Sequence, residues 1–200
     1  MPVPVAVQPD PATLPRGQQE RRERIVRAAI TLLEHGEYDA IQMRDVAQEA
    51  AVALATVYRY FTSKEHLYAA ALLEWAANFP AREQAKRADG RSDEAQLRAL
   101  MRRAVRAFER YPQMMRAEIV LESSTDPNAR ALFDQFAARN GDALRSALPS
   151  TDPDTAATII ETVNSVLATR LRSWALGRIT IADVDRSVQK TLDLIFAPRS

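Results

Sequence analysis

The chain has 200 residues, enough for one large domain or two small ones, and its hydrophobic fraction of 46% can fill a core. It has no cysteine, which excludes a disulfide framework, a thiolate nucleophile and a cysteine-based zinc site, and which is consistent with a cytoplasmic protein. The formal net charge is only +1, so any nucleic-acid contact must come from a local basic patch rather than from overall charge.

Residues 1–16 precede the first predicted helix. Five of them are prolines, which exclude a helix or an inner strand, and we expect a disordered arm. The arm is either a frayed terminus or a segment that lies along DNA, although its first fifteen residues carry no lysine or arginine. It lacks the basic start and apolar stretch of a signal peptide, and no part of the chain approaches the roughly 18 apolar residues of a membrane span.

Helical periodicity begins after Pro15. Apolar residues recur at i, i+3, i+4, i+7 and i+8, which predicts a first helix over residues 17–35 with Gly36 as a left-handed stop. Two short helices are expected next, over residues 43–50 and 53–60. The apolar stripe of the first helix consists of Ile25, Ala28, Ala29, Leu32 and Leu33.

Capping side chains mark where most helices should begin. Gln42 occupies the N-cap position of the second helix, and Thr62–Glu65 has the pattern of a capping box that opens a fourth helix ending near Arg87. Asp126-Pro127 and Asp152-Pro153 each place an N-cap carboxylate before a proline at the first helical position. The helices predicted for the later chain cover residues 94–110, 112–122, 127–148, 153–176 and 181–196.

No segment alternates with the period of two that is typical of strands bounded by hairpin turns. The sequence therefore predicts an all-α fold of about nine helices. Three of them form an N-terminal helix-turn-helix domain over residues 17–68. A C-terminal helical bundle covers residues 69–200.

The run from Gln42 to Tyr68 has the layout of a helix-turn-helix that enters a DNA major groove. Val52 and Val57 suit the inner face, and short side chains at the start of the third helix let its backbone approach the groove. Hydroxyl-bearing side chains on the outer face can bond phosphates or bases. The candidate DNA-binding residues are Gln42, Arg44, Ala53, Leu54, Ala55, Thr56, Tyr58, Arg59, Tyr60 and Lys64.

Lys64 lies in the first turn of the fourth helix. Its charge there adds to the unpaired N–H groups and the positive end of the helix dipole, which together can bind an anion. Between Ala51 and Lys64 there are two positive residues, Arg59 and Lys64, and no acid. This segment is the local basic patch that the near-neutral chain requires.

The string TVYRYFTSKEHL, with the preceding QMRDVAQEA helix, resembles the TetR family of bacterial one-component repressors. The resemblance covers about residues 22–68, and the pattern YxYFxxKxxL is among the family's most specific marks. It implies a small-molecule pocket in the bundle. The implied roles are Thr56, Tyr58 and Tyr60 near DNA, Lys64 on a phosphate, and Phe61 and Leu67 in the core.

Four positions depart from the family pattern. The family often has glycine where this chain has Ala51, so Ala51 must adopt an unfavourable turn conformation or the turn must differ. Ala53 supplies no N-cap oxygen, at a typical cost of ~1 kcal/mol. Ala55 replaces a common glycine and Leu54 a commonly polar outward residue, which leaves base preference open.

Within the family, the DNA-binding half is most similar to the Kst-type regulators of actinobacterial sterol catabolism. The shared strings are QMR-x-VA in the second helix and VYRYF after it. Since the likeness lies mainly in the DNA-binding half, it implies little about the ligand.

The bundle contains apolar residues that are candidates for a cavity wall, with ordinary core packing as the alternative. Four arginines could meet the carboxylate or phosphate of an acidic ligand, or could simply face solvent: Arg102, Arg103, Arg106 and Arg116. The candidate pocket residues are Trp75, Phe79, Met101, Phe108, Met114, Met115, Ile119, Phe133 and Phe136.

The last two predicted helices carry apolar stripes that can serve both the monomer core and a four-helix interface across a twofold axis. A symmetric dimer presents two reading heads, so its operator should be a near-palindrome. The candidate interface residues are Ile160, Val163, Leu167, Leu171, Trp174, Val184, Val188, Leu192 and Ile195.

An enzyme is not expected, and neither is a cofactor or a metal site. The two histidines, His35 and His66, lie near helix ends without a partner motif, and the chain has no HExxH, GxSxG or P-loop pattern. Asp126 and Asp152 are explained as helix caps.

The sequence predicts a repressor that leaves its operator when a small hydrophobic ligand binds, possible ligands including a lipid- or steroid-derived acyl-CoA. Such a ligand must bind the DNA-free arrangement more tightly than the DNA-bound one. The alternative is a DNA-binding dimer with a filled bundle and no effector. The operator, the effector and the regulated genes stay open, as does activation instead of repression.

Overall fold

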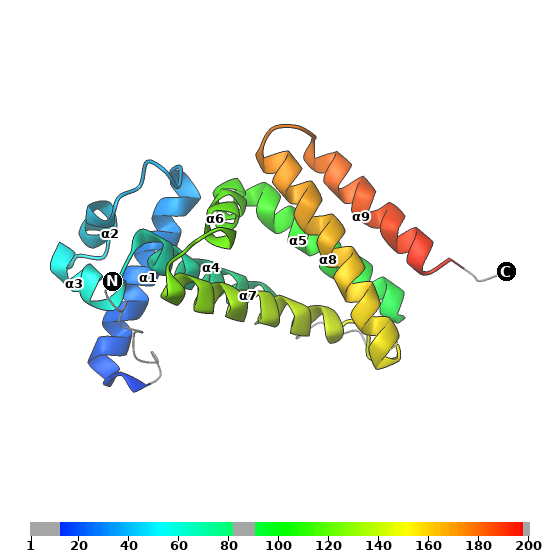
Figure 1. The fold of residues 1–200 in the computed structure, drawn as a ribbon, viewed down its shortest axis with the longest axis horizontal. Helices are drawn as coiled ribbons and strands as arrows, with labels where there is room; N and C mark the ends of the chain where they lie inside the picture. Colours follow the sequence, from blue (N-terminus) through cyan, green and yellow to red (C-terminus); the bar gives the residue numbers. More distant parts are fainter. Residues whose placement is uncertain (1–12, 82–90, 198–200) are drawn as a thin grey trace. The chain divides into compact units, whose positions relative to one another are not determined.

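The computed structural model describes residues 13–81 and 91–197, with residues 78–81 described for their backbone. Within these ranges the chain forms helices and no strand, as the sequence predicts (Figure 1). The first twelve residues of the predicted arm and the predicted helix end near Arg87 lie outside them. The helices are α1 (Arg16–His35), α2 (Met43–Glu49), α3 (Leu54–Tyr60), α4 (Lys64–Ala81), α5 (Asp93–Arg110), α6 (Pro112–Glu122), α7 (Pro127–Arg145), α8 (Pro153–Ala175) and α9 (Ile181–Ile195).

The described residues fall into two compact units. The first holds the residues up to Ala81 together with Arg116–Phe136, and the second holds residues 91–115 and those from Ala137 onward. The chain passes from one unit to the other within α6 and again within α7. The first unit thus extends beyond the predicted helix-turn-helix domain and includes α4 and the α6–α7 corner, which is the segment between those two helices.

The core of the first unit is built where α1 packs on α4 and α2, and where α2 packs on α3. The buried residues of α1 are Ile25, Val26, Ala28, Ala29 and Leu33. Val26 is thus buried although it is not in the predicted stripe, and Leu32 of that stripe is only half-buried. Each large side chain buried there contributes about 1.5–3 kcal/mol relative to an exposed one.

Gly36 ends α1 in a different way from the predicted left-handed stop. Its φ of −135° and ψ of 162° are extended, and its N–H donates to the Leu32 carbonyl at 2.8 Å. A Cβ at this position would lie 3.2 Å from the same oxygen. Glycine is therefore favoured here by the close approach of the backbone and not by a positive φ.

The start of α4 corrects the predicted Thr62–Glu65 capping box. The N-cap is Ser63, whose Oγ accepts a hydrogen bond from the His66 N–H at 2.9 Å. The Thr62 hydroxyl instead donates to Asp126, 64 residues away, at 3.0 Å. Two adjacent hydroxyl residues could each have capped the helix, and a partner from the α6–α7 corner decides between them.

The second unit is built around α8 and α9, which pack side by side and on α5 (Figure 1). Six of the nine predicted dimer-interface residues are buried in this single chain, so they belong to the core of the unit. The other three, Ile160, Trp174 and Ile195, are half-buried. The six buried residues are Val163, Leu167, Leu171, Val184, Val188 and Leu192.

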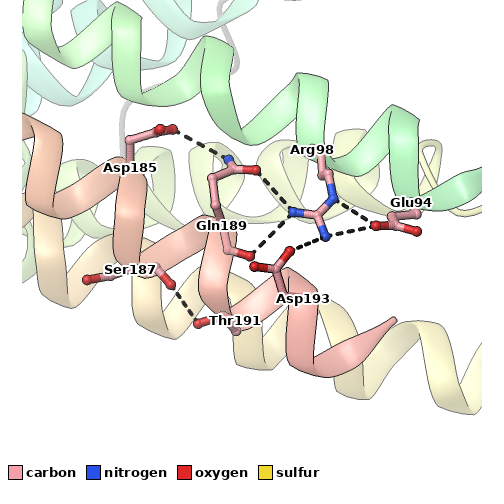
Figure 2. A network of polar contacts seen from close by, with 7 residues as sticks. All are labelled: Glu94, Arg98, Asp185, Ser187, Gln189, Thr191 and Asp193. Carbon is pink, nitrogen blue, oxygen red and sulfur yellow. Dashed lines mark hydrogen bonds and ion pairs between the residues drawn. The ribbon is translucent and has the colours of Figure 1, made fainter. Parts of the chain in front are cut away.

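Arg98 joins α5 to α9 through a network of polar contacts (Figure 2). Its Nη2 lies 2.7 Å from a carboxylate oxygen of Asp193 and 2.8 Å from one of Glu94. Its Nη1 donates to the backbone and side-chain oxygens of Gln189 at 3.3 and 3.2 Å. The side chain is 19% exposed, so these charge-assisted bonds are partly shielded from water.

Candidate nucleic-acid interface

The inner faces of α2 and α3 fix the frame of the predicted reading head. Met43, Val46 and Ala47 of α2 are buried. Of the two residues predicted for the inner face, Val57 is fully buried and Val52 is half-buried. Gln42 caps α2 from an extended conformation, and its N–H donates to an Asp45 carboxylate oxygen at 2.8 Å. The opposite faces of both helices are left to solvent.

The turn between α2 and α3 takes the strained form that the sequence allows for. Ala51 has a φ of +51° and is the one non-glycine residue with a positive φ among those described. Val52 N–H then donates to the Ala47 carbonyl at 2.9 Å. A left-handed alanine costs roughly 1–2 kcal/mol, so the turn is closed at the expense of stability.

The exposed face of α3 carries most of the predicted DNA-binding residues. Leu54 is 41% exposed and Tyr58 50% exposed, while Thr56 is half-buried. The N-cap, Ala53, has an extended backbone and no side-chain cap, as predicted. Of the other predicted DNA-binding residues, Ala53, Ala55 and Arg59 at α3 are exposed. Gln42 and Arg44 at the start of α2 are exposed as well.

Tyr60 lies apart from this surface. It is 6% exposed, and its hydroxyl is buried with no hydrogen-bond partner in the described part of the chain. The Arg59 guanidinium lies 5.2 Å from the centre of its ring. The resemblance placed Tyr60 near DNA, but this conformation gives its hydroxyl no access to a phosphate, and Tyr58 is the tyrosine of α3 that reaches solvent.

Lys64 is held in place by Tyr38. Its ammonium donates to the Tyr38 carbonyl and lies 4.2 Å from the centre of the Tyr38 ring. Burial lowers the pKa of Lys64, although the carboxylates of Asp39, Glu65 and Asp45 act against this. An ammonium has three donors, so Lys64 can bond a phosphate while it keeps the bond to Tyr38.

A polar cluster joins the segment between α3 and α4 to the α6–α7 corner, and it was not predicted. We call it the Thr62 junction, and it consists of Thr62, His66, Asp126 and Asn128. Thr62 N–H donates to His66 Nδ1 at 3.2 Å, and the Asn128 amide donates to Thr62 Oγ1 at 3.3 Å. His66 and Asn128 are buried. The sequence offered a signal only for the capping role of Asp126.

The protonation states of the Thr62 junction follow from its contacts. Burial lowers the pKa of His66 to about 4, with the Asp126 carboxylate opposing this and Arg22 adding to it. Partial burial would raise the pKa of Asp126, but hydrogen bonds from the Ser63 side chain, the Ala129 and Asn128 backbone and the Thr62 side chain together lower it. At neutral pH the imidazole is therefore neutral and the carboxylate is charged.

The predicted ligand-pocket residues are divided between the two units. Trp75, Met101, Phe108, Met114, Met115 and Phe136 are buried, Ile119 and Phe133 are half-buried, and the side chain of Phe79 lies outside the described residues. An open groove of 540 Å³ in the first unit is lined by Ser63, Glu65, Val120 and residues 123–127, and by none of the nine. The pocket stays a prediction.

The described residues contain no group of three histidine, cysteine, aspartate or glutamate side chains that could hold a metal ion. Among the same residues, none of the helices has the length and apolarity needed to cross a membrane.

Comparison with known proteins matches both parts of the chain. Residues 25–71 match the family model described as "Bacterial regulatory proteins, tetR family". Residues 90–195 match the model described as "Tetracyclin repressor-like, C-terminal domain". The first match covers α2, α3 and the Thr56–Lys64 segment, which are the elements that form the candidate interface.

Relatives cover nearly the whole chain. The HTH-type transcriptional repressor KstR of Rhodococcus jostii is 30% identical over 184 residues, which are 92% of this chain and 86% of that protein. A TetR transcriptional regulator from Rhodococcus sp. RHA1 has a similar structure, with a TM-score of 0.72 and 25% identity over 92% of this chain and all of the other. Thermus thermophilus FadR, a TetR-family repressor in complex with lauroyl-CoA, has a TM-score of 0.71 and 21% identity over 90% of this chain and 96% of its own.

Proposed function

The chain belongs to the TetR family of bacterial regulatory proteins, and from this we propose that it represses transcription as a homodimer on a near-palindromic DNA operator, from which a small hydrophobic ligand releases it. The observation that carries the proposal is the exposed face of α3. Tyr58 and Arg59 are exposed there beside short side chains, and no acid lies between Ala51 and Lys64. The proposed place of action is the cytoplasm, and no catalytic activity is proposed.

The contacts that we propose divide into two kinds. Tyr58, Arg59 and Lys64 bind phosphates, which positions the protein but reads no sequence. Thr56 and the exposed side chains of Ala53, Leu54 and Ala55 face base edges, where Leu54 favours apolar contact such as a thymine methyl group. Gln42 and Arg44 add contacts from the start of α2. Tyr60 is left out because its hydroxyl is buried.

The proposed effector is an acyl-CoA or another small lipid- or steroid-derived compound. Support comes from two relatives: a FadR repressor of the same fold binds lauroyl-CoA, and another relative is the repressor KstR. The methionine and aromatic side chains of the bundle can adapt to an apolar ligand. A ligand of this kind dissociates the complex only if it prefers the DNA-free state.

The DNA-binding proposal is tested by selecting duplexes from a random library with the wild-type protein, followed by titration of the best duplex at several salt concentrations. Lys64→Ala should weaken binding to selected and unselected duplexes alike and should reduce the slope of log affinity against log salt by about one. Lys190→Ala is the control: it makes the same change at an exposed lysine of α9 and should leave the slope unchanged. An unchanged slope in Lys64→Ala would remove Lys64 from the interface.

The effector proposal is tested on the same selected duplex. Lauroyl-CoA and a steroid-CoA ester are added separately, with free CoA as the control for the nucleotide part. We expect the acylated compounds, and not free CoA, to lower the affinity for DNA. If no compound changes the affinity while the duplex still binds, the ligand-independent dimer is the better description.

A further inference from the structure

We infer that Asp126, at the α6–α7 corner, is a positioning residue for DNA binding, because its carboxylate fixes the segment that joins the recognition helix α3 to α4. The inference rests on the proposed function, since it assigns a role within the same DNA-binding surface. Asp126 lies outside the stretch of sequence that resembles a helix-turn-helix and does not itself belong to the reading head.

The first line of evidence is the geometry of Thr62, which lies between the two helices. Phe61 ends α3 and is fully buried, and Ser63 caps α4. The Thr62 hydroxyl donates to Asp126 Oδ2 at 3.0 Å and accepts from the Asn128 amide at 3.3 Å, while its N–H donates to His66. The hydroxyl oxygen also lies 3.1 Å from His66 Nδ1, so four polar contacts hold a single linker residue.

The second line of evidence is that the Asp126 carboxylate has partners in two places: the first turn of α7, and the segment before α4, where the side chains of Thr62 and Ser63 both bond it. Its Oδ1 caps α7 by accepting from the Asn128 and Ala129 N–H groups at 2.8 and 3.1 Å, and its Oδ2 accepts from Thr62. Asp152 begins α8 with the same Asp-Pro sequence but is exposed, and its cap bond is to the Thr155 N–H at 3.0 Å. Helix capping therefore accounts for Oδ1 alone.

The consequence for DNA binding follows from what adjoins Thr62. The exposed residues Tyr58 and Arg59 lie four and three positions before it, respectively, and Lys64 lies two positions after it. Proposed phosphate contacts thus lie on both sides of one hydrogen-bonded residue. If the residue is released, the ends of α3 and α4 gain freedom, and that freedom must be lost again when the protein binds DNA.

The decisive variant separates the two roles of Asp126. In Asp126→Asn, the amide oxygen can still cap α7, but the amide nitrogen cannot accept from Thr62. We expect affinity for the selected duplex to fall by at least about fivefold, which is less than the tenfold or more that corresponds to one whole charge-assisted hydrogen bond. Asp152→Asn is the matched control, and its affinity should stay within about twofold of wild type.

A second pair of variants tests whether the effect passes through Thr62. Thr62→Val removes the hydroxyl and should lower affinity as Asp126→Asn does, while Thr62→Ser keeps the hydroxyl and should restore it. The double variant Thr62→Val/Asp126→Asn should lose less affinity than the sum of the two single variants, because both changes remove the bond between Thr62 and Asp126. Unfolding is measured for every variant, so that a loss of fold is not read as a loss of DNA binding.

The outcomes are distinguishable. If folded Asp126→Asn binds the selected duplex as tightly as wild type, Asp126 is a helix cap only, and the proposed function is unaffected. The inference is also overturned if Asp152→Asn weakens binding equally, since the effect would then come from capping in general. If the wild-type protein enriches no duplex from the library, the proposed function fails and takes the inference with it.

Discussion

His66 is buried at the start of α4, where its Nδ1 accepts the Thr62 N–H and its ring lies 5.2 Å from that of Phe61. A protonated ring would turn this acceptor into a donor facing another donor. Burial also disfavours the charged ring, and it is burial that lowers the pKa of His66 from 6.5 to about 4 in the folded protein. The unfolded chain has no such preference, which makes folding depend on pH.

We predict that stability falls as the pH is lowered from about 6.5 to about 4, because the unfolded chain then takes up a proton that the folded chain does not. The slope due to His66 should be at most about 1.4 kcal/mol per pH unit. In His66→Asn, whose amide oxygen keeps an acceptor near Nδ1 without titrating, this contribution should vanish. Urea unfolding of both proteins across this range measures it, and equal slopes would contradict it.

Asp126 titrates in a different window. Its pKa is lowered from 3.8, so its contribution is present above that value and is lost as the pH falls further. The difference between wild type and His66→Asn isolates the imidazole, because both proteins share all carboxylates.

Ala51 gives a second prediction for a single residue. Its φ of +51° suits glycine better than alanine, so Ala51→Gly should raise the free energy of unfolding by about 1 kcal/mol, even after the entropy that glycine adds to the unfolded chain. Ala55→Gly, an exposed position inside α3, should change it in the opposite direction by up to about 1 kcal/mol. Thermal or urea unfolding checks the signs, and a loss in Ala51→Gly would mean that the turn is not strained.

Among the helices, the capping residues show how far local sequence determines structure. Asp152 and the Thr180–Asp183 box begin α8 and α9 as predicted, because every atom of such a cap lies within three residues. The start of α4 was misassigned by one residue, since Thr62 and Ser63 offer the same local chemistry. Asp126 decides between them, and a contact over 64 residues has no local signal.

The contact between α5 and α9 depends on the polar network of Arg98. Arg98→Met keeps an apolar stem but removes the guanidinium that binds Glu94, Gln189 and Asp193 (Figure 2), and it should lower the free energy of unfolding by about 1–2 kcal/mol. Arg186→Met is the control. Arg186 is 62% exposed and binds Asp183 within α9, so its loss should cost less than about 0.5 kcal/mol. Equal losses would mean that the Arg98 network adds nothing beyond a surface ion pair.

At the scale of the whole molecule, apolar periodicity predicted which residues are buried but not what buries them. Val163 and Val188 belong to stripes that were predicted to serve both the core and a dimer interface, and both are fully buried within one chain. The outer face of α3 could be predicted because α2 and α3 are short helices, and the apolar side chains of each clearly mark its inner face. An apolar stripe on a long helix has the same pattern against its own chain as against a second copy.

The proposed dimer then needs an apolar surface that the single chain leaves open. Leu194 on α9 is 81% exposed, more than any other large hydrophobic residue in the described ranges. We predict that Leu194→Glu raises the dimer dissociation constant by about tenfold or more. Leu54→Glu, on exposed α3, should leave it unchanged. Sedimentation over a range of concentrations measures both, and wild-type behaviour of Leu194→Glu would exclude this residue from the interface.

The crossing of the chain within α6 and α7 has a consequence for hybrid regulators. The unit that carries α2 and α3 is assembled from two separate stretches of sequence, so a graft that transfers only residues up to Ala81 brings Thr62 without Asp126. The recipient's own α6–α7 corner would then face a foreign Thr62. Exchange of reading heads between such proteins should work best when residues 116–136 travel with the N-terminal stretch as a matched pair.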